Sequence, residues 1–310
     1  MSRVLVFGAK SLVGSHFVQT SGHRIYAAGL RDPRGFGVRV EGFREVDMNS
    51  PSAAATAVAG ADVDAIINFG AATDVDRVEH ERPASPEAAK GAAYKVNVLA
   101  PAAMSKAALA RGLPFVLLST DFVFDGREGP YPESAVPSDW SPLVSWYGWT
   151  KGRGERLVLD ANPSASVVRI SYPYRTDYPR KLDFGRKILA ARRQNAGVAY
   201  FDDQWITPTW IPDVTQALDV ILERRKNGVF HVASPERTTP FEFARELVTQ
   251  VEGKDPGLTP GSMEEFLHRP GATPRPRHGG LSCHRIEEEG LRLTSWRDGV
   301  RLLAEDYAAA

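Results

Sequence analysis

The sequence has a single cysteine, Cys283, among 310 residues, so an intramolecular disulfide is excluded and a reducing compartment is indicated. Neither charge is in excess, because 38 Lys and Arg residues balance 38 Asp and Glu residues. This balance gives no sign of a nucleic-acid or membrane-surface partner. No apolar run approaches the roughly 20 residues of a membrane span, and the N-terminus enters a strand rather than a signal peptide. We therefore expect a cytoplasmic protein.

A metal site is not expected either. His278, Cys283 and His284 lie close together in the sequence, but they lack the paired spacing of a zinc site. The hydrophobic content of 43% and the charged content of 25% are typical of an ordinary globular protein. The length allows one large domain, or one domain with a small lobe.

The N-terminal segment has the pattern of a dinucleotide-binding turn. An apolar run, Arg3–Phe7, is followed by a glycine-bounded loop, Gly8–Gly14, and then by a helical pattern. A strand, a glycine turn and a helix N-terminus together cradle a pyrophosphate, because unpaired N–H groups and the helix dipole face the anion. Ser11 stands where the usual fingerprint has glycine, and its hydroxyl could donate to a phosphate oxygen. The expected cofactor contacts here are Gly8, Lys10, Ser11, Leu12 and Val13.

The end of a second expected strand, residues 24–28, bears on the choice of cofactor. An acid at this position binds the ribose 2′-hydroxyl of NAD, whereas an arginine accommodates the 2′-phosphate of NADP. Arg31 occupies the basic position and Asp32 follows it at once. The pair predicts a preference for NADP(H), with NAD(H) possible, although a solvated Arg–Asp turn would give the same sequence.

The chemistry centres on a tyrosine and a lysine four residues apart. A buried-strand run, residues 115–118, delivers the hydroxyls of Ser119 and Thr120 to the end of a strand. If residues 145–160 are helical, Tyr147 and Lys151 lie on one face, one turn apart. A cation beside a phenol favours the phenolate, so we expect the pKa of Tyr147 to fall towards neutrality. Tyr147 would then be a proton donor and acceptor, although the same spacing also occurs by chance on exposed helices.

The segment "STDFVFDG", followed by "YGWTKGRGE", resembles the extended short-chain dehydrogenase/reductase family, in its dTDP-4-dehydrorhamnose reductase branch. The resemblance covers nearly the whole chain, including "DQWITPTWIPD" at residues 203–213. It implies that Thr120, Tyr147 and Lys151 are catalytic. The alternation of strands and helices independently predicts a Rossmann-type doubly wound parallel sheet.

The resemblance also assigns further site residues. It places Asp47 and Met48 against the adenine, and the small residues Gly70, Ala71 and Ala72 against the flat cofactor. The expected substrate contacts are Thr120, Asp121, Tyr172, Gln204 and Trp205, with Tyr172 standing where the branch has tryptophan.

A long helical pattern covers residues 86–112, with Val96, Leu99, Met104 and Leu109 as expected core positions. Asn97 is a polar residue within this apolar stripe. The resemblance makes Asn97 a cofactor-site residue that supports the active-site backbone and the lysine. A satisfied buried asparagine is the alternative.

The expected architecture has two parts. Residues 1–170 and 213–235 form the NAD(P)-binding Rossmann domain, and residues 171–212 and 236–310 form a smaller substrate-binding lobe. The resemblance implies an NAD(P)H-dependent reductase of a nucleotide-activated 4-keto-6-deoxysugar, acting as a monomer or homodimer. Two alternatives stay open: a nucleotide-sugar epimerase or epimerase-reductase, and a non-catalytic NADP-binding regulatory subunit like that of methionine adenosyltransferase.

Overall fold

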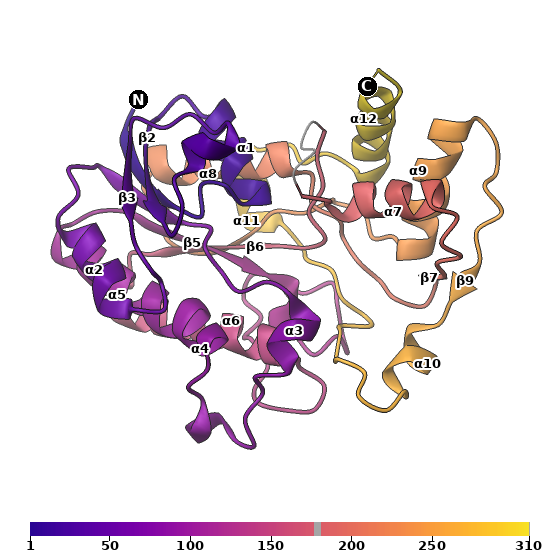
Figure 1. Cartoon of the computed structure of the whole chain (residues 1–310), viewed down its shortest axis with the longest axis horizontal. Helices are drawn as coiled ribbons and strands as arrows, with labels where there is room; N and C mark the ends of the chain where they lie inside the picture. The colour runs from indigo at the N-terminus through magenta and orange to yellow at the C-terminus, as the bar shows by residue number, and fades with distance from the viewer. Residues whose placement is uncertain (177–180, 310) are drawn as a thin grey trace.

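The computed structural model of the chain describes residues 1–176 and 181–309 (Figure 1). Its centre is a seven-stranded sheet in the order β3-β2-β1-β4-β5-β6-β8, and every neighbouring pair is parallel. This order confirms the predicted doubly wound sheet, since the chain moves outward in one direction from β1 and then in the other. The strands are β1 (Arg3–Phe7), β2 (Arg24–Gly29), β3 (Gly42–Glu45), β4 (Ala65–Asn68), β5 (Phe115–Thr120), β6 (Ser166–Ile170) and β8 (Gly228–His231).

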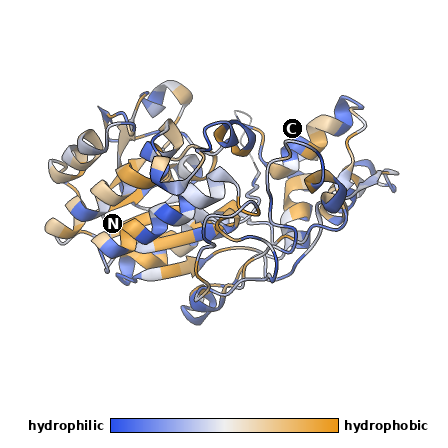
Figure 2. Cartoon of the chain, turned by 90° about the horizontal axis from the view of Figure 1, so that it is seen from below, coloured by the Kyte–Doolittle hydropathy of each residue, from blue (hydrophilic) through white to orange (hydrophobic). Residues whose placement is uncertain are grey.

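Helices cover both faces of the sheet, which explains why its central strands β1 and β4 are buried along almost their whole length and are mostly apolar. Figure 2 shows this hydrophobic centre within a more polar periphery. One apolar core joins the sheet to helices of the first face, and a separate core joins it to helices of the second. The first face carries α1 (Leu12–Thr20), α8 (Ile211–Glu223) and α11 (His284–Glu288); the second carries α2 (Pro51–Ala59), α5 (Ala100–Ala110) and α6 (Trp146–Ala161).

The helix predicted for residues 86–112 begins later and is irregular. After α3 (Val75–Glu79) and a short 3₁₀ turn (Pro86–Ala88), the helix starts as α4 (Ala92–Tyr94) and passes through a π-helical turn (Lys95–Leu99) into α5. The wider turn changes the phase of the side chains that follow it. Met104 is fully buried as predicted, but Leu99 and Leu109 are 37% and 44% exposed, so their assignment to the core was wrong.

A smaller lobe with its own apolar core lies beside the sheet domain (Figure 1). That core joins Tyr174, Phe243, Leu247, Trp296 and Val300. One segment that we expected in the lobe, α11, packs instead on β8 in the sheet domain. The lobe contains α7 (Phe184–Arg193), α9 (Pro240–Glu252), α10 (Met263–Leu267), α12 (Trp296–Ala309) and a two-stranded parallel sheet of β7 (Tyr200–Phe201) and β9 (Pro260–Gly261).

The position of α6 sets the geometry of the expected active site. Its first turn is capped by Ser145, whose hydroxyl accepts a hydrogen bond from the Gly148 amide at 3.1 Å. Gly148 has no side chain, and a Cβ there would lie 2.0 Å from the Phe122 carbonyl oxygen. The glycine therefore allows α6 to approach the turn after β5 and brings Tyr147 to the end of that strand. Within the described residues, no helix combines the length and the apolar character that crossing a bilayer requires.

Candidate active site

The predicted site residues meet at the carboxyl edge of the sheet. Because β1, β4, β5 and β6 are parallel neighbours, their ends bring four loops to the same edge. These loops carry Gly8 after β1, Gly70 after β4, Thr120 at the end of β5 and Tyr172 after β6. Residues more than 160 positions apart in the sequence therefore border one site.

The glycine loop lies directly against the segment after β4. Gly8 has a left-handed backbone with a φ of +76°, and a Cβ there would lie 2.7 Å from the amide nitrogen of Gly70. Ser11 is the N-cap of α1, and its hydroxyl oxygen accepts a hydrogen bond from the Gly14 amide at 3.0 Å. This use of the oxygen leaves the hydroxyl hydrogen available to donate. Leu12 and Val13 are buried in the first turn of α1, so their contribution to an anion site is their backbone N–H groups.

After β2, Asp32 pairs with Arg34 and not with its neighbour Arg31. Asp32 caps a 3₁₀ turn (Pro33–Phe36) and pairs with Arg34, whose Nε lies 3.0 Å from both carboxylate oxygens. Arg31 is exposed and forms no ion pair with any residue that the structure describes. Lys10 reaches the same region from the glycine loop, with its amino group 4.6 Å from the centre of the Phe36 ring.

The part of the site expected to hold the adenine is bordered by Met48 and Gly70. Met48 packs against Gly70, and Asp47 accepts hydrogen bonds from the backbone and side-chain amides of Asn49 at 2.8 and 3.0 Å. Nearby, Asn68 ends β4, and its side-chain oxygen Oδ1 accepts a hydrogen bond from the Gly70 amide at 2.9 Å. The side-chain nitrogen of Asn68 is buried without a partner among the described residues. Such an unpaired buried donor is uncommon away from functional sites.

Asn97 holds the segment after β4 in place. The π-helical turn directs Asn97 inward, where it is 1% exposed. Its side-chain oxygen accepts from the Ala72 amide at 2.8 Å, and its nitrogen donates to the Ala72 carbonyl and to the Thr150 hydroxyl, both at 3.1 Å. Asn97 thus ties the Ala71–Ala72 backbone to α6, and it contacts the residue beside Lys151 rather than Lys151 itself.

A buried carboxylate stands beside the Thr120 hydroxyl. The two oxygens of Asp121 accept hydrogen bonds from Thr120 at 3.2 Å and from Ser171 at 2.6 Å. Burial raises the pKa of Asp121 to about 6, although these hydrogen bonds act in the opposite direction. Ser171 was not among the site residues expected from the sequence. It reaches the site because β6 lies beside β5, so that the ends of both strands meet at the same edge.

Tyr147 and Lys151 lie on one buried face of α6, but the expected effect of the lysine on the tyrosine is wrong. Burial raises the pKa of Tyr147 above its usual range, and the Asp121 charge adds to this, while a hydrogen bond with Thr120 opposes it. Lys151 instead donates from Nζ to the Leu118 carbonyl at 2.6 Å. Burial lowers the pKa of Lys151 to about 8, against the attraction of Glu155. Tyr147 is therefore a protonated phenol at neutral pH.

A pocket of about 640 Å³ lies between the sheet domain and the lobe, and it is lined by Phe122, whose ring contacts that of Tyr147. Tyr172 and Gln204 both line it, and the Gln204 amide donates to the Tyr172 hydroxyl at 2.9 Å. Tyr172 has a φ of +43°, a strained conformation for a residue with a side chain. Trp205 is not among the described residues that line the pocket; it packs 5.0 Å beneath the Arg237 guanidinium.

Three cations border the same pocket: Lys181, Lys187 and Arg275. Arg275 comes from the C-terminal segment and pairs at 2.8 Å with Asp76, at the start of α3 in the sheet domain. Nothing local in the sequence around Arg275 indicates that this loop returns to the pocket.

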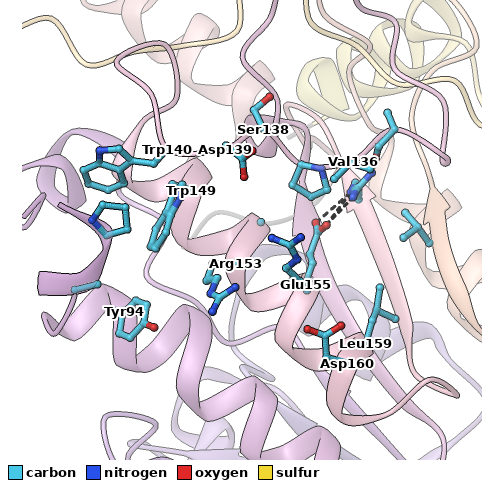
Figure 3. Close-up of a pocket in the computed structure, with 18 of the residues that line it drawn as sticks. Tyr94, Val136, Ser138, Asp139, Trp140, Trp149, Arg153, Glu155, Leu159 and Asp160 are labelled. Carbon is cyan, nitrogen blue, oxygen red and sulfur yellow. Dashed lines mark hydrogen bonds and ion pairs between the residues drawn. The ribbon is translucent and has the colours of Figure 1, made fainter.

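A larger pocket, of about 810 Å³, lies on the other side of α6 (Figure 3). Trp140, Trp149 and Tyr94 stand at one end of it, and the buried Glu155–Arg169 ion pair forms part of its wall. None of Thr120, Tyr147 and Lys151 lines it. None of the three lines the 640 Å³ pocket either, but Phe122, whose ring contacts that of Tyr147, lines the 640 Å³ pocket and not this one. Nowhere in residues 1–176 and 181–309 do three or more His, Cys, Asp or Glu side chains gather as metal ligands.

The parallel sheet, the glycine loop at its edge and the Tyr/Lys helix together define a Rossmann-type dinucleotide-binding protein. The sequence model described as the RmlD substrate binding domain matches residues 2–309, and the chain belongs to this family.

Relatives of known description agree with that assignment. The chain is 33% identical to the dTDP-4-dehydrorhamnose reductase of Mycolicibacterium smegmatis, over 83% of this chain and 74% of the relative. It is 32% identical to the methionine adenosyltransferase 2 subunit beta of Xenopus tropicalis, over 71% of this chain and 66% of the relative. Among solved structures, the dTDP-4-dehydrorhamnose reductase of Bacillus anthracis in complex with NADP has a TM-score of 0.80, with 23% identity and coverage of 97% and 98% of the two chains.

Proposed function

We propose that the protein is an NADPH-dependent reductase of a nucleotide-linked 4-keto-6-deoxysugar. One observation carries the proposal: the Tyr147 phenol, the Thr120 hydroxyl and the Lys151 ammonium converge at the end of β5, beside a pocket large enough for a sugar. The reductase among the relatives supports the substrate class. The two residue stretches that we assign as a cofactor domain, 1–170 and 213–235, and the two that we assign as a substrate lobe, 171–212 and 236–310, meet at this pocket.

The residues at the sheet edge fit a dinucleotide. The Gly8 loop and the first turn of α1 offer backbone donors to a pyrophosphate, with Lys10 and the Ser11 hydroxyl beside them. The backbone at Gly70, Ala71 and Ala72 is free of bulky side chains, and Asp47 and Met48 border it on the adenine side. The exposed Arg31 favours NADP(H), while NAD(H) is a possible second cofactor.

The chain's own residues supply the acid and the charge stabilisation. When bound, NADPH supplies the hydride that reduces the keto carbon. Tyr147, protonated at neutral pH, gives its proton to the carbonyl oxygen as negative charge develops there. Thr120, whose hydroxyl donates to Asp121 in the structure, would turn to donate a hydrogen bond to the same oxygen, and the contact strengthens as the charge grows. Lys151, one turn along α6, donates to the Leu118 carbonyl and would hydrogen-bond the nicotinamide ribose of the bound cofactor.

The neighbouring pocket fits the rest of a nucleotide sugar. Lys181 and Lys187 supply positive charge for a diphosphate, while Arg275 is paired with Asp76. The sugar would lie towards Tyr172 and Gln204, within reach of Asp121. Trp205 packs beneath Arg237, so a contact from it to the sugar would come from outside this pocket. We propose a cytoplasmic monomer or homodimer, on the reducing environment that the single cysteine indicates.

The test is to mix the purified protein with NADPH and a dTDP-4-keto-6-deoxysugar and to follow the absorbance of NADPH. We expect NADPH oxidation that requires the nucleotide-linked sugar and is absent with the free ketosugar. Tight NADPH binding without turnover would instead favour a regulatory subunit like the Xenopus relative. Conversion of the sugar without net NADPH oxidation would favour an epimerase.

A further inference from the structure

The side chain of Asp32 is fully engaged by Arg34. Arg34 Nε donates to both carboxylate oxygens at 3.0 Å, and the Arg34 backbone amide donates to Oδ1 at 2.9 Å. The guanidinium reaches Oδ2 as well, at 2.5 Å, which makes the contact a two-pronged one. The 3₁₀ turn (Pro33–Phe36) brings Arg34 back over Asp32, two residues earlier.

This contact changes the charge at the end of β2. An acid here is the group that binds the ribose 2′-hydroxyl of NAD and that repels the 2′-phosphate of NADP. With Asp32 neutralised by Arg34, the charge left without an ion pair among the described residues is that of Arg31, and Lys10 lies near it. Arg31 and Asp32 therefore do not compete, one for NADP and the other for NAD, as their adjacent positions in the sequence suggest.

We propose that Arg34 sets the cofactor preference of this protein indirectly, by withdrawing the Asp32 carboxylate so that Arg31 can bind the 2′-phosphate of NADPH. Arg34 is a positioning residue in this account. The inference rests on the proposed function, because it concerns the cofactor site. It assigns a role in cofactor choice to Arg34, which lies outside both the glycine loop and the helix that carries Tyr147 and Lys151.

A direct alternative is that Arg34 itself binds the phosphate, and a double substitution separates the two. Arg34→Ala frees the carboxylate of Asp32, which then repels the 2′-phosphate and accepts from the 2′-hydroxyl of NADH. Asp32→Asn removes that charge but keeps an oxygen to cap the 3₁₀ turn. If Arg34 acts only through Asp32, adding Asp32→Asn to Arg34→Ala restores the preference. If Arg34 holds the phosphate, the double variant stays as weak as the single one.

The experiment measures the dissociation constants of NADPH and NADH by fluorescence titration, so that no turnover is needed. We expect Arg34→Ala to lower the NADPH preference by about tenfold, the size of one charge-assisted contact. The double variant should return to within about threefold of wild type, and Arg31→Ala should lose the preference whether or not Asp32 is present. Arg24→Ala is the matched control, since Arg24 pairs with Glu41 at 3.3 Å at the other end of β2.

An unchanged preference in Arg34→Ala, or a double variant no better than the single one, would overturn the inference. Equal binding of NADPH and NADH by wild type would overturn it too, while leaving the reductase proposal intact. Failure of wild type to bind either cofactor would sink both.

Discussion

Replacing Lys151 with methionine should lower turnover without lowering the stability of the protein. Lys151 is 3% exposed, and burial lowers its pKa from 10.5 to about 8. At about 1.4 kcal/mol per pKa unit, this shift corresponds to roughly 3 kcal/mol by which folding disfavours the charged amine. Methionine keeps the length of the side chain without the charge, and it loses one hydrogen bond to the Leu118 carbonyl. We expect the free energy of unfolding at pH 7 to stay unchanged or to rise by about 1–3 kcal/mol.

The pH dependence follows from the direction of the shift. Because the pKa of Lys151 is lower in the folded protein, the unfolded chain binds more protons between about pH 8 and the ordinary lysine pKa of 10.5. Stability conferred by this group therefore rises with pH across that window. Lys151→Met should lack the rise. Turnover should fall by about two orders of magnitude or more, because the contact that Lys151 would make to the nicotinamide ribose is lost.

The assay is urea unfolding of wild type and Lys151→Met at pH 7 and pH 9.5, with NADPH turnover measured on the same samples. Lys106→Met, on the exposed side of α5, is the matched control and should change neither quantity. A loss of 2 kcal/mol or more in the variant at pH 7, or equal pH slopes in the two proteins, would refute a buried ammonium with a lowered pKa. Wild-type turnover in the variant would refute its role in the reaction.

Two glycine-related substitutions test the scaffold of the site. Ser11→Gly should keep NADPH affinity and cost only about a few tenths of a kcal/mol in stability, since glycine is a tolerated N-cap; a large rise in the NADPH dissociation constant would show that the Ser11 hydroxyl binds phosphate. Gly148→Ala should lower the unfolding free energy by about 1–3 kcal/mol and reduce turnover, because its Cβ would lie 2.0 Å from the Phe122 carbonyl oxygen and push α6 away from β5. Gly22→Ala, with no atom near the added Cβ, is the control, and equal melting temperatures for the two variants would contradict this view of α6.

The sequence predicted the sheet well because its signals are local. An apolar run that stops at a glycine or a small polar residue marks a parallel strand, and β1 spans Arg3–Phe7 as predicted. Helix caps are equally local, since Ser50 precedes Pro51 at the start of α2 and its hydroxyl accepts a hydrogen bond from the Ala53 amide. The site residues Thr120, Tyr147 and Lys151 meet because the strand ends and the i, i+4 spacing leave little freedom.

The errors concern quantities that the sequence does not encode locally. Leu99 and Leu109 follow a helical period that the π-helical turn interrupts, and that turn depends on packing against α6. The pKa of Tyr147 was expected to fall because spacing places a lysine nearby, but spacing says nothing about burial, which dominates here. The pairing of Asp32 with Arg34 depends on the 3₁₀ turn between them, which propensity alone does not predict.

The most direct test of the central claim is the turnover of Tyr147→Phe. The substitution removes the phenolic proton and keeps the ring, which packs edge-on against Phe122 at 5.8 Å. With NADPH and a dTDP-4-keto-6-deoxysugar, we expect turnover to fall by about 10²–10⁴-fold, with the melting temperature and the NADPH dissociation constant nearly unchanged. If wild type is active and Tyr147→Phe stays within about threefold of it, Tyr147 is not the proton donor and the mechanism proposed for this site is wrong.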